Sequence, residues 1–137
     1  MLKVHISSAL RAAFAERPEL LAEIANEFGR WQSRPERSHC WFGRVSKDKE
    51  GLQHAHMIPA NVKASREQWD LQWKLRRPWR RRSDRYVLFA HGGHRGVLLI
   101  WILDDPGAHE IWNTRHLSLV KRFQSIASNF IHLGVVS

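Results

Sequence analysis

Residues 84–112, DRYVLFAHGGHRGVLLIWILDDPGAHEIW, decide the fold, because they contain the two most strongly apolar runs of the chain. The runs at residues 86–90 and 96–103 predict β-strands, and the glycine-rich sequence at 91–94 is typical of the turn in an antiparallel hairpin. The second run is apolar on both faces, which predicts a central strand covered on each side. The sequence DDPG at 104–107 predicts the turn that ends it.

The residues at the start of the chain predict a strand and a helix. Residues 2–6 alternate apolar and polar side chains as a short strand does, after which either the strand continues or a helix begins, capped by Ser7 or Ser8. Pro18 is a favourable first-turn residue for an amphipathic helix, which we expect to end before Pro35. The apolar stripe of this helix consists of Leu20, Leu21, Ile24, Phe28 and Trp31.

The middle of the chain predicts a loop, a strand and a basic segment. Residues 38–51 are expected to form a loop, and the alternating sequence LQHAHMIP at 52–59 predicts a strand beside the hairpin. The following segment is ambiguous, because Ser65 and Gln68 resemble a helical capping box whereas residues 69–75 alternate as in a strand.

Residues 76–85, RRPWRRRSDR, contain six arginines and one acidic residue, and their proline excludes a continuous helix. We therefore expect a long basic loop at about residues 60–84.

The last part of the chain predicts a helix that begins near Asn113 or Thr114 and is closed by Gly134. Residues 1–137 then form a single domain of the α+β class. We expect an antiparallel sheet of about four strands with N-terminal and C-terminal helices packed on it. The apolar stripe of the last helix consists of Leu117, Val120, Phe123, Ile126, Ala127 and Phe130.

The formal net charge of +9 is concentrated in one part of the chain. Residues 30–85 contain 15 Lys and Arg against 6 Asp and Glu, whereas the remaining residues contain 7 of each kind. This concentration predicts a polyanionic partner, with nucleic acid as the leading candidate. The alternative is a basic surface that only keeps the protein soluble.

Several classes of protein are disfavoured by what the sequence lacks. Cys40 is the only cysteine, which excludes an intrachain disulfide and a cysteine-based zinc site. The first 14 residues have no apolar core of a signal peptide, and no apolar run approaches the about 20 residues of a membrane span. We expect a cytoplasmic protein without membrane contact. Without a nucleophile elbow or phosphate-binding glycine loop, covalent and nucleotide-hydrolysing mechanisms are disfavoured, and no cofactor or metal is expected.

His54 and His56 lie side by side on one face of the predicted strand, and three roles are open for them. With a third ligand such as Glu110 or Asp84 they could bind a metal. As an acid–base pair they could move the protons of a phosphodiester transfer near neutral pH. They could also be hydrogen-bonded residues with a structural role only.

Two further residues are candidates for a site that acts on a phosphodiester. His109 follows the turn that ends the central strand, where a side chain is held by rigid backbone and is open to solvent. Arg44 could clamp a phosphate through its bidentate guanidinium group. The alternative for each is an ordinary surface residue.

The sequence resembles the YafO family of type II toxins between residues 42 and 130, with a weaker similarity in the first strand and helix. The resemblance implies a toxin that cleaves mRNA in association with the ribosome and is held inactive by a co-expressed antitoxin. It also implies the compact α+β architecture of RelE-like toxins. The motifs that carry it, in order, are Phe42-Gly43-Arg44, His54-x-His56, Arg82-Ser83-Asp84 and LLIWILDDPGAHE, with Pro106 and His109.

The sequence departs from the family pattern in two places. Val45 and Ser46 follow the arginine where an acidic residue is expected, and residues 69–82 are richer in Trp and Arg than the usual connection. The first departure concerns the role of the Arg44 loop, and the second concerns contacts with ribosome or antitoxin. The residues that fall on family positions are Phe42, Gly43, Arg44, His54, His56, Asp84 and His109.

Cleavage of RNA without a metal needs a base for the 2′-hydroxyl proton, an acid for the 5′-oxygen and cations for the phosphorane charge. We predict His56 and His109 as the proton-transfer pair, converging on one edge of the sheet, with Arg44 on the phosphate and His54 in support. The predicted RNA-binding residues are Trp79, Arg80, Arg81, Arg82 and Arg85.

Two other functions are compatible with the same residues. One is a non-catalytic RNA- or DNA-binding module in which Trp69, Trp73 or Trp79 stacks on bases. The other is a toxin that inhibits a DNA enzyme. For the nuclease we expect three partners, namely an acidic antitoxin in a hetero-oligomer, the ribosome and mRNA.

Overall fold

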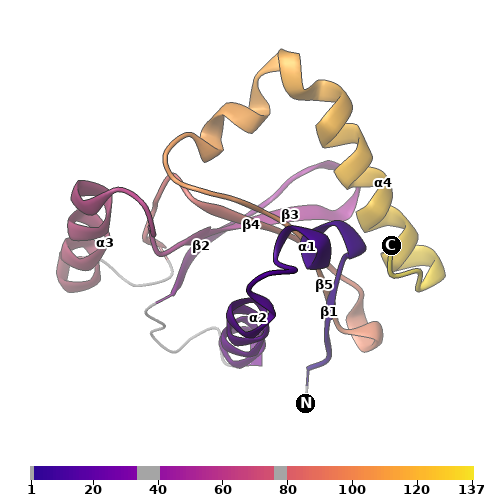
Figure 1. The fold of residues 1–137 in the computed structure, drawn as a ribbon. Coiled ribbons are helices and arrows are strands. Elements are labelled where there is room, and N and C mark those ends of the chain that lie inside the picture. Colours follow the sequence, from indigo (N-terminus) through magenta and orange to yellow (C-terminus); the bar gives the residue numbers. More distant parts are fainter. Residues whose placement is uncertain (1, 34–40, 76–79) are drawn as a thin grey trace.

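The structure is a computed structural model, and it describes residues 2–33, 41–75 and 80–137. Helices and strands alternate along the chain (Figure 1). The strands are β1 (Val4–Ile6), β2 (Phe42–Lys47), β3 (Leu52–Met57), β4 (Tyr86–His91) and β5 (Val97–Leu103). The α-helices are α1 (Ser8–Ala13), α2 (Pro18–Ser33), α3 (Lys63–Leu75) and α4 (Leu117–Leu133). The 3₁₀ turns are η1 (Lys49–Gly51), η3 (Gly93–Arg95), η4 (Ala108–Trp112) and η5 (Thr114–His116).

The five strands form one mixed sheet in the order β1-β5-β4-β3-β2. The predicted hairpin of β4 and β5 is confirmed, and β3 lies beside it as expected, with His56 opposite Tyr86. Neighbouring strands are antiparallel except for β1, which runs parallel to β5. The α+β class is therefore confirmed, while the sheet has one strand more than expected and one parallel pair. The helical connection after β1 frees its direction from the hairpin rule that sets the other pairs.

The additional strand is β2, and the prediction of a loop over this part of the chain was wrong. Its sequence, FGRVSK, lacks the regular apolar alternation by which a strand is recognised. Phe42 and Gly43 are buried, while Arg44, Val45 and Lys47 are exposed, as suits an edge strand.

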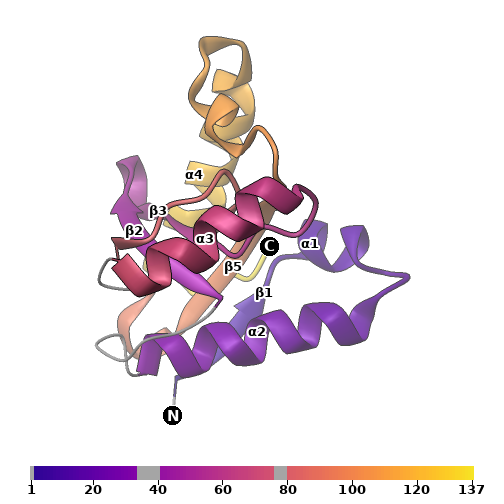
Figure 2. The same ribbon diagram turned by 90° about the vertical axis from the view of Figure 1, so that its left-hand side faces the viewer.

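A helix covers each face of the sheet (Figures 1 and 2). On one face Phe28 of α2 packs edge-on against Phe42 and Phe89, with ring centroids 5.4 and 5.0 Å apart. On the other face Phe130 and the rest of the apolar stripe of α4 cover Leu88 and their neighbours. The predicted stripes of both helices thus form the two halves of the core. Among the described residues, none of the helices has the length and apolar composition to cross a bilayer.

Residues 60–75 were expected to belong to a basic loop, and this prediction was wrong because most of them form α3. Trp69 is fully buried while Arg66, Gln68 and Asp70 are exposed, so the helical period rather than the strand period describes this segment. The second half of the predicted loop lies partly outside the described residues, which resume at Arg80.

The ends of the remaining helices follow the sequence signals. Ser7, one of the two predicted caps, accepts a hydrogen bond from the backbone N–H of Leu10 at 3.1 Å and so starts α1. Gly134 ends α4 in the left-handed conformation, with φ 69°. Residues 113–116, where the last helix was expected to begin, form η5 instead.

Candidate active site

His54 and His56 lie on the α4 face of β3, beyond the part of the sheet that α4 covers with its apolar residues. Their rings are 5.7 Å apart, and the ring of Tyr86 on β4 lies 4.6 Å from His54 and 4.9 Å from His56. All three side chains are more than nine-tenths buried. The strand alternation therefore places two imidazoles and a phenol together, as it predicted for the histidines.

His56 is held by the backbone of Ser83. Its Nδ1 atom lies 2.7 Å from the carbonyl oxygen and 2.9 Å from the amide nitrogen of Ser83. Because the contact with the oxygen is the shorter, we assign the ring proton to Nδ1, which leaves a lone pair on Nε2. Burial lowers the pKa of His56 to about 4, against the raising effect of Ser83 and with help from the positive charges of His54, Arg44 and Arg82. His56 is therefore neutral near pH 7.

His109 is held by the carboxylate of Asp84, the residue next to Ser83. Its backbone N–H donates to Oδ1 of Asp84 at 2.9 Å, and its Nδ1 atom lies 2.7 Å from the same oxygen. This hydrogen bond and the negative charge of Asp84 raise the pKa of His109. Burial raises the pKa of Asp84, but hydrogen bonds from His109 and Gly107 outweigh it and lower that pKa overall.

One dipeptide, Ser83-Asp84, thus holds two histidines in opposite ways. The residues Ser83 and Asp84 immediately precede β4, while His56 comes from β3 and His109 from the turn after β5. We call His54, His56, Ser83, Asp84 and His109 the histidine site.

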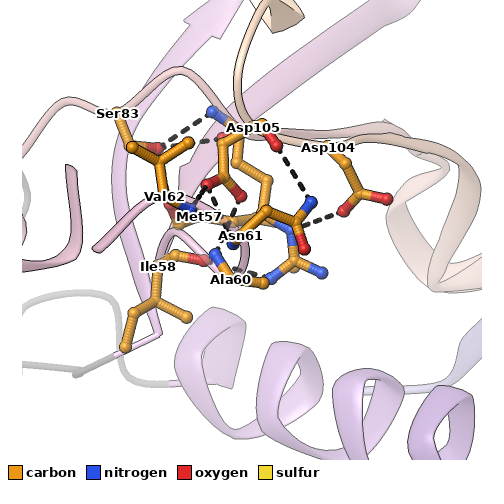
Figure 3. Close-up of polar contacts among 9 residues, drawn as sticks. Met57, Ile58, Ala60, Asn61, Val62, Ser83, Asp104 and Asp105 are labelled. Atoms are coloured by element: carbon orange, nitrogen blue, oxygen red, sulfur yellow. Dashed lines mark hydrogen bonds and ion pairs between the residues drawn. The ribbon is translucent and has the colours of Figure 1, made fainter. Parts of the chain in front are cut away.

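The dipeptide itself is fixed by contacts with the end of β3. The hydroxyl of Ser83 donates to the carbonyl oxygen of Met57 (Figure 3). The guanidinium of Arg85 donates from Nη1 to the carbonyl oxygen of Ile58 and from Nε to Asp104, each at 3.0 Å. Contacts on both sides therefore hold the backbone that carries the histidine partners.

Asp105 joins the turn after β5 to the segment that leads into α3 (Figure 3). Its carboxylate accepts hydrogen bonds from the backbone N–H groups of Ala60, Asn61 and Val62 at 2.8–2.9 Å. Burial raises the pKa of Asp105, but these three donors outweigh it and lower the pKa overall. The turn that positions His109 is thereby anchored to the rest of the domain.

His54 has different partners from His56. Its Nδ1 atom lies 2.9 Å from Oδ2 of Asp48, which follows β2, and its ring centroid is 5.2 Å from that of Trp112 in η4. His54 therefore joins the end of β2 to η4, which agrees with the supporting role predicted for it.

The predicted cationic residues divide into an exposed group and a buried group. Arg44, Arg80 and Arg82 are exposed, and the charges of Arg44 and Arg82 act on His56. Arg81 is only 1% exposed, and its guanidinium lies over Trp69, 4.1 Å from the ring centroid. Its burial contradicts the prediction that its side chain is on the RNA-binding surface.

Arg85 also differs from its predicted role. Its side chain is 11% exposed and pairs with Asp104, so its charge is already partnered within the protein. Trp79, the remaining predicted RNA-binding residue, lies outside the described residues.

The metal alternative finds no support in the described ranges, where no three His, Cys, Asp or Glu side chains are placed to hold an ion together. Of the two possible third ligands, Asp84 is bound to His109 and Glu110 pairs with Arg115 at 3.6 Å. The arrangement suits proton transfer better than metal binding.

The sequence analysis missed the residues that orient the histidines. Tyr86 could have been found, because pairing the two predicted strands places it opposite His56. Asp48 and Trp112 gave no comparable signal, since they come from turns whose approach to β3 depends on the tertiary fold.

Comparison with known proteins gives one match. A family model described as "Toxin YafO, type II toxin-antitoxin system" matches residues 23–132, which is most of the chain and includes the whole histidine site. Searches of curated proteins and of solved structures found no match. The extent of the family match confirms the resemblance that the motifs indicated. The chain therefore belongs to the YafO family, a family of toxins of type II toxin–antitoxin systems that each act against a cognate antitoxin.

Proposed function

We propose that this toxin is a metal-independent endoribonuclease that cleaves mRNA at the ribosome and so inhibits translation. The observation that carries the proposal is that adjacent residues, Ser83 and Asp84, hold two histidines in different protonation states. A neutral imidazole and a protonated imidazole are the base and the acid that RNA cleavage requires.

In the first step His56 is the base. Its Nε2 atom takes the proton of the ribose 2′-hydroxyl, and the 2′-oxygen forms a bond to phosphorus. Because burial lowers the pKa of His56 to about 4, the ring stays unprotonated and ready to accept a proton at neutral pH.

In the second step His109 is the acid. The bond between phosphorus and the 5′-oxygen breaks, and His109 gives the Nε2 proton to that oxygen. The products are a 2′,3′-cyclic phosphate on one fragment and a 5′-hydroxyl on the other. The raised pKa of His109 keeps more of it protonated at neutral pH, and the exposure of its side chain allows contact with a large substrate.

The negative charge on phosphorus needs cations nearby. Arg44 and Arg82 are exposed, and their charges already act on His56, so they are placed to stabilise the phosphorane. Arg80 extends the exposed basic surface along the path of the RNA. His54 supports His56 from the same strand face rather than acting on the substrate.

The ribosome and mRNA are the proposed targets because the excess charge lies in residues 30–85, beside the site. The same charge favours an acidic segment in the antitoxin, which would cover the site and arrest cleavage. The proposed compartment is the cytoplasm, where ribosomes are found.

The proposal is tested by inducing the toxin in cells without antitoxin and mapping mRNA 5′ ends. We expect growth arrest with new 5′ ends in translated mRNA, absent from cells producing His56→Gln or His109→Gln. Purified toxin should cleave ribosome-bound mRNA in EDTA if the ribosomes remain intact. Growth arrest with intact mRNA would instead indicate inhibition of a DNA enzyme, and no arrest a binding module.

A further inference from the structure

A groove of about 470 Å³ lies beside the histidine site, between the end of β2 and the start of α4. Its volume is within the range of about 300–1,000 Å³ that is typical of small-molecule sites. Residues that line it include Lys47, Lys49, Trp112, Asn113, Leu117 and Gln124. We call it the lysine groove.

The lysine groove and the histidine site share a wall. Asp48, which also lines the groove, accepts the hydrogen bond from Nδ1 of His54 at 2.9 Å. Trp112 lines the groove and has its ring centroid 5.2 Å from that of His54. A ligand in the groove would therefore lie next to the substrate of the histidine site.

The groove combines three kinds of chemistry that a nucleotide needs. Trp112 and Leu117 are 40% and 52% exposed and offer an apolar and aromatic surface for a base. Asn113 accepts the N–H of Arg115 with its side-chain oxygen at 3.2 Å, so its NH₂ group is the part that can donate to a base edge. Gln124 adds a second amide from α4.

The charge of the groove indicates which class of ligand fits it. Lys47 and Lys49 are exposed, whereas the carboxylate of Asp48 is engaged by His54. The groove therefore presents cations to an anionic ligand, beside an aromatic surface of a size suited to one base.

We propose that the lysine groove binds one nucleotide of the RNA next to the scissile phosphate and reads its base. The inference rests on the proposed nuclease function and extends it to substrate preference. The base packs on Trp112 and Leu117, the amides of Asn113 and Gln124 contact its edge, and Lys47 and Lys49 contact the phosphate. A segment of a protein partner is the competing occupant.

The first test measures binding without any cleavage. The antitoxin-free toxin is titrated with each nucleoside 3′-monophosphate, and the indole N–H signals are followed by NMR, with Trp112→Phe to assign the signal. We expect the Trp112 signal to shift with at least one nucleotide, and Trp112→Ala to bind it about tenfold to a hundredfold more weakly. Lys47→Ala with Lys49→Ala should weaken binding and reduce its salt dependence.

Control variants separate the groove from general effects of substitution. Asn129→Ala and Lys121→Ala replace the same residue types at exposed positions of α4, outside the residues that line the groove. Both should bind the nucleotide as the unsubstituted toxin does. If no nucleotide shifts the Trp112 signal, or if the controls lose as much affinity as the groove variants, the proposal is overturned.

The second test measures base preference from the mapped mRNA 5′ ends. Asn113→Ala and Gln124→Ala should still cleave, with a relaxed preference at one position next to the cut, while Asn129→Ala keeps the original preference. Unchanged preference in every variant would overturn the groove proposal and leave the nuclease intact. No cleavage by the unsubstituted toxin would reject the nuclease, and the titration would then decide the groove alone. Loss of antitoxin binding with unchanged nucleotide binding would assign the groove to the protein partner.

Discussion

The carboxylate of Asp84 contacts His109 twice, through the backbone N–H at 2.9 Å and through Nδ1 at 2.7 Å. The second contact leaves Nε2 as the nitrogen that can meet a substrate. Because the carboxylate also raises the pKa of His109, the same residue sets the orientation and the charge of the proposed acid.

Replacing Asp84 with Asn should therefore change the pH dependence of cleavage. His109 acts in its protonated form, so activity is lost as the pH rises through its pKa. Without the Asp84 charge that pKa falls, and the alkaline limb of kcat/KM should move to lower pH. The measurement is the cleavage rate against pH, with Asp70→Asn on the exposed face of α3 as control. An alkaline limb at the same pH in both variants would contradict the role of Asp84.

The low pKa of His56 predicts that the protein loses stability in mild acid. The pKa is about 4 in the folded protein and 6.5 in the reference state, so the unfolded chain binds more protons between these values. Stability should fall by about 2–3 kcal/mol as the pH drops from 6.5 through 4. Urea unfolding across this range measures it, and His56→Gln should show a shallower decline. Equal slopes in both proteins would mean that His56 is not a buried neutral group.

The exposed arginines should affect binding rather than folding. Arg80→Ala and Arg82→Ala each remove one phosphate contact, so ribosome binding should weaken and the salt slope should become shallower by about 1. Binding measured over a range of salt concentrations tests this, with the melting temperature as a check on folding. A salt slope that stays unchanged would mean that these residues are only solvated.

Arg81 should behave in the opposite way to its two neighbours. Its guanidinium is buried over Trp69 and lies 3.4 Å from the carbonyl oxygen of Phe42, where it can donate from Nη2. Arg81→Ala should lower the free energy of unfolding by about 2 kcal/mol or more, because a desolvated cation–π contact is lost. Denaturant unfolding of all three arginine variants gives a direct comparison. Wild-type stability with weakened ribosome binding in Arg81→Ala would contradict the burial.

Asp105 should contribute more to stability than the neighbouring Asp104. Asp105→Asn removes the charge that accepts three backbone N–H groups and should cost about 2–3 kcal/mol. Asp104→Asn loses an exposed pair with Arg85 and should cost less than about 1 kcal/mol. Since the pKa of Asp105 is lowered, its contribution should be present above pH about 4 and be lost below it. Equal unfolding free energies for the two variants would contradict this account.

The parts of the fold with strong periodicity could be predicted from the sequence. The hairpin of β4 and β5 and the stripes of α2 and α4 bury long apolar runs, so local pattern and tertiary packing agree. β2 lacks this agreement because it is a largely exposed edge strand. The structure of α3 was undecided because Trp69 and its neighbours fit two periods, and the burial of Trp69 selects the helix.

The candidate site was predictable only in part. Alternation places His54 and His56 together, because that depends on one strand alone. The contact of Asp84 with His109 spans 25 residues and follows from the β4–β5 register, which opposes Tyr86 to Leu103 and brings the flanking turns together. The burial of Arg81 likewise depends on a contact with another element, which a count of charges does not reveal.

The most direct test of the two histidine roles uses an mRNA with sulfur in place of the 5′-oxygen at the cleaved bond. A thiolate leaves without protonation, so this substrate needs the base but not the acid. On the natural substrate, His56→Gln and His109→Gln should each be slower than the unsubstituted toxin by about 10²–10⁴. On the sulfur substrate, His109→Gln should regain most of the unsubstituted rate, while His56→Gln should stay slow. Recovery of both variants, or of neither, would contradict the assignment of His56 as base and His109 as acid.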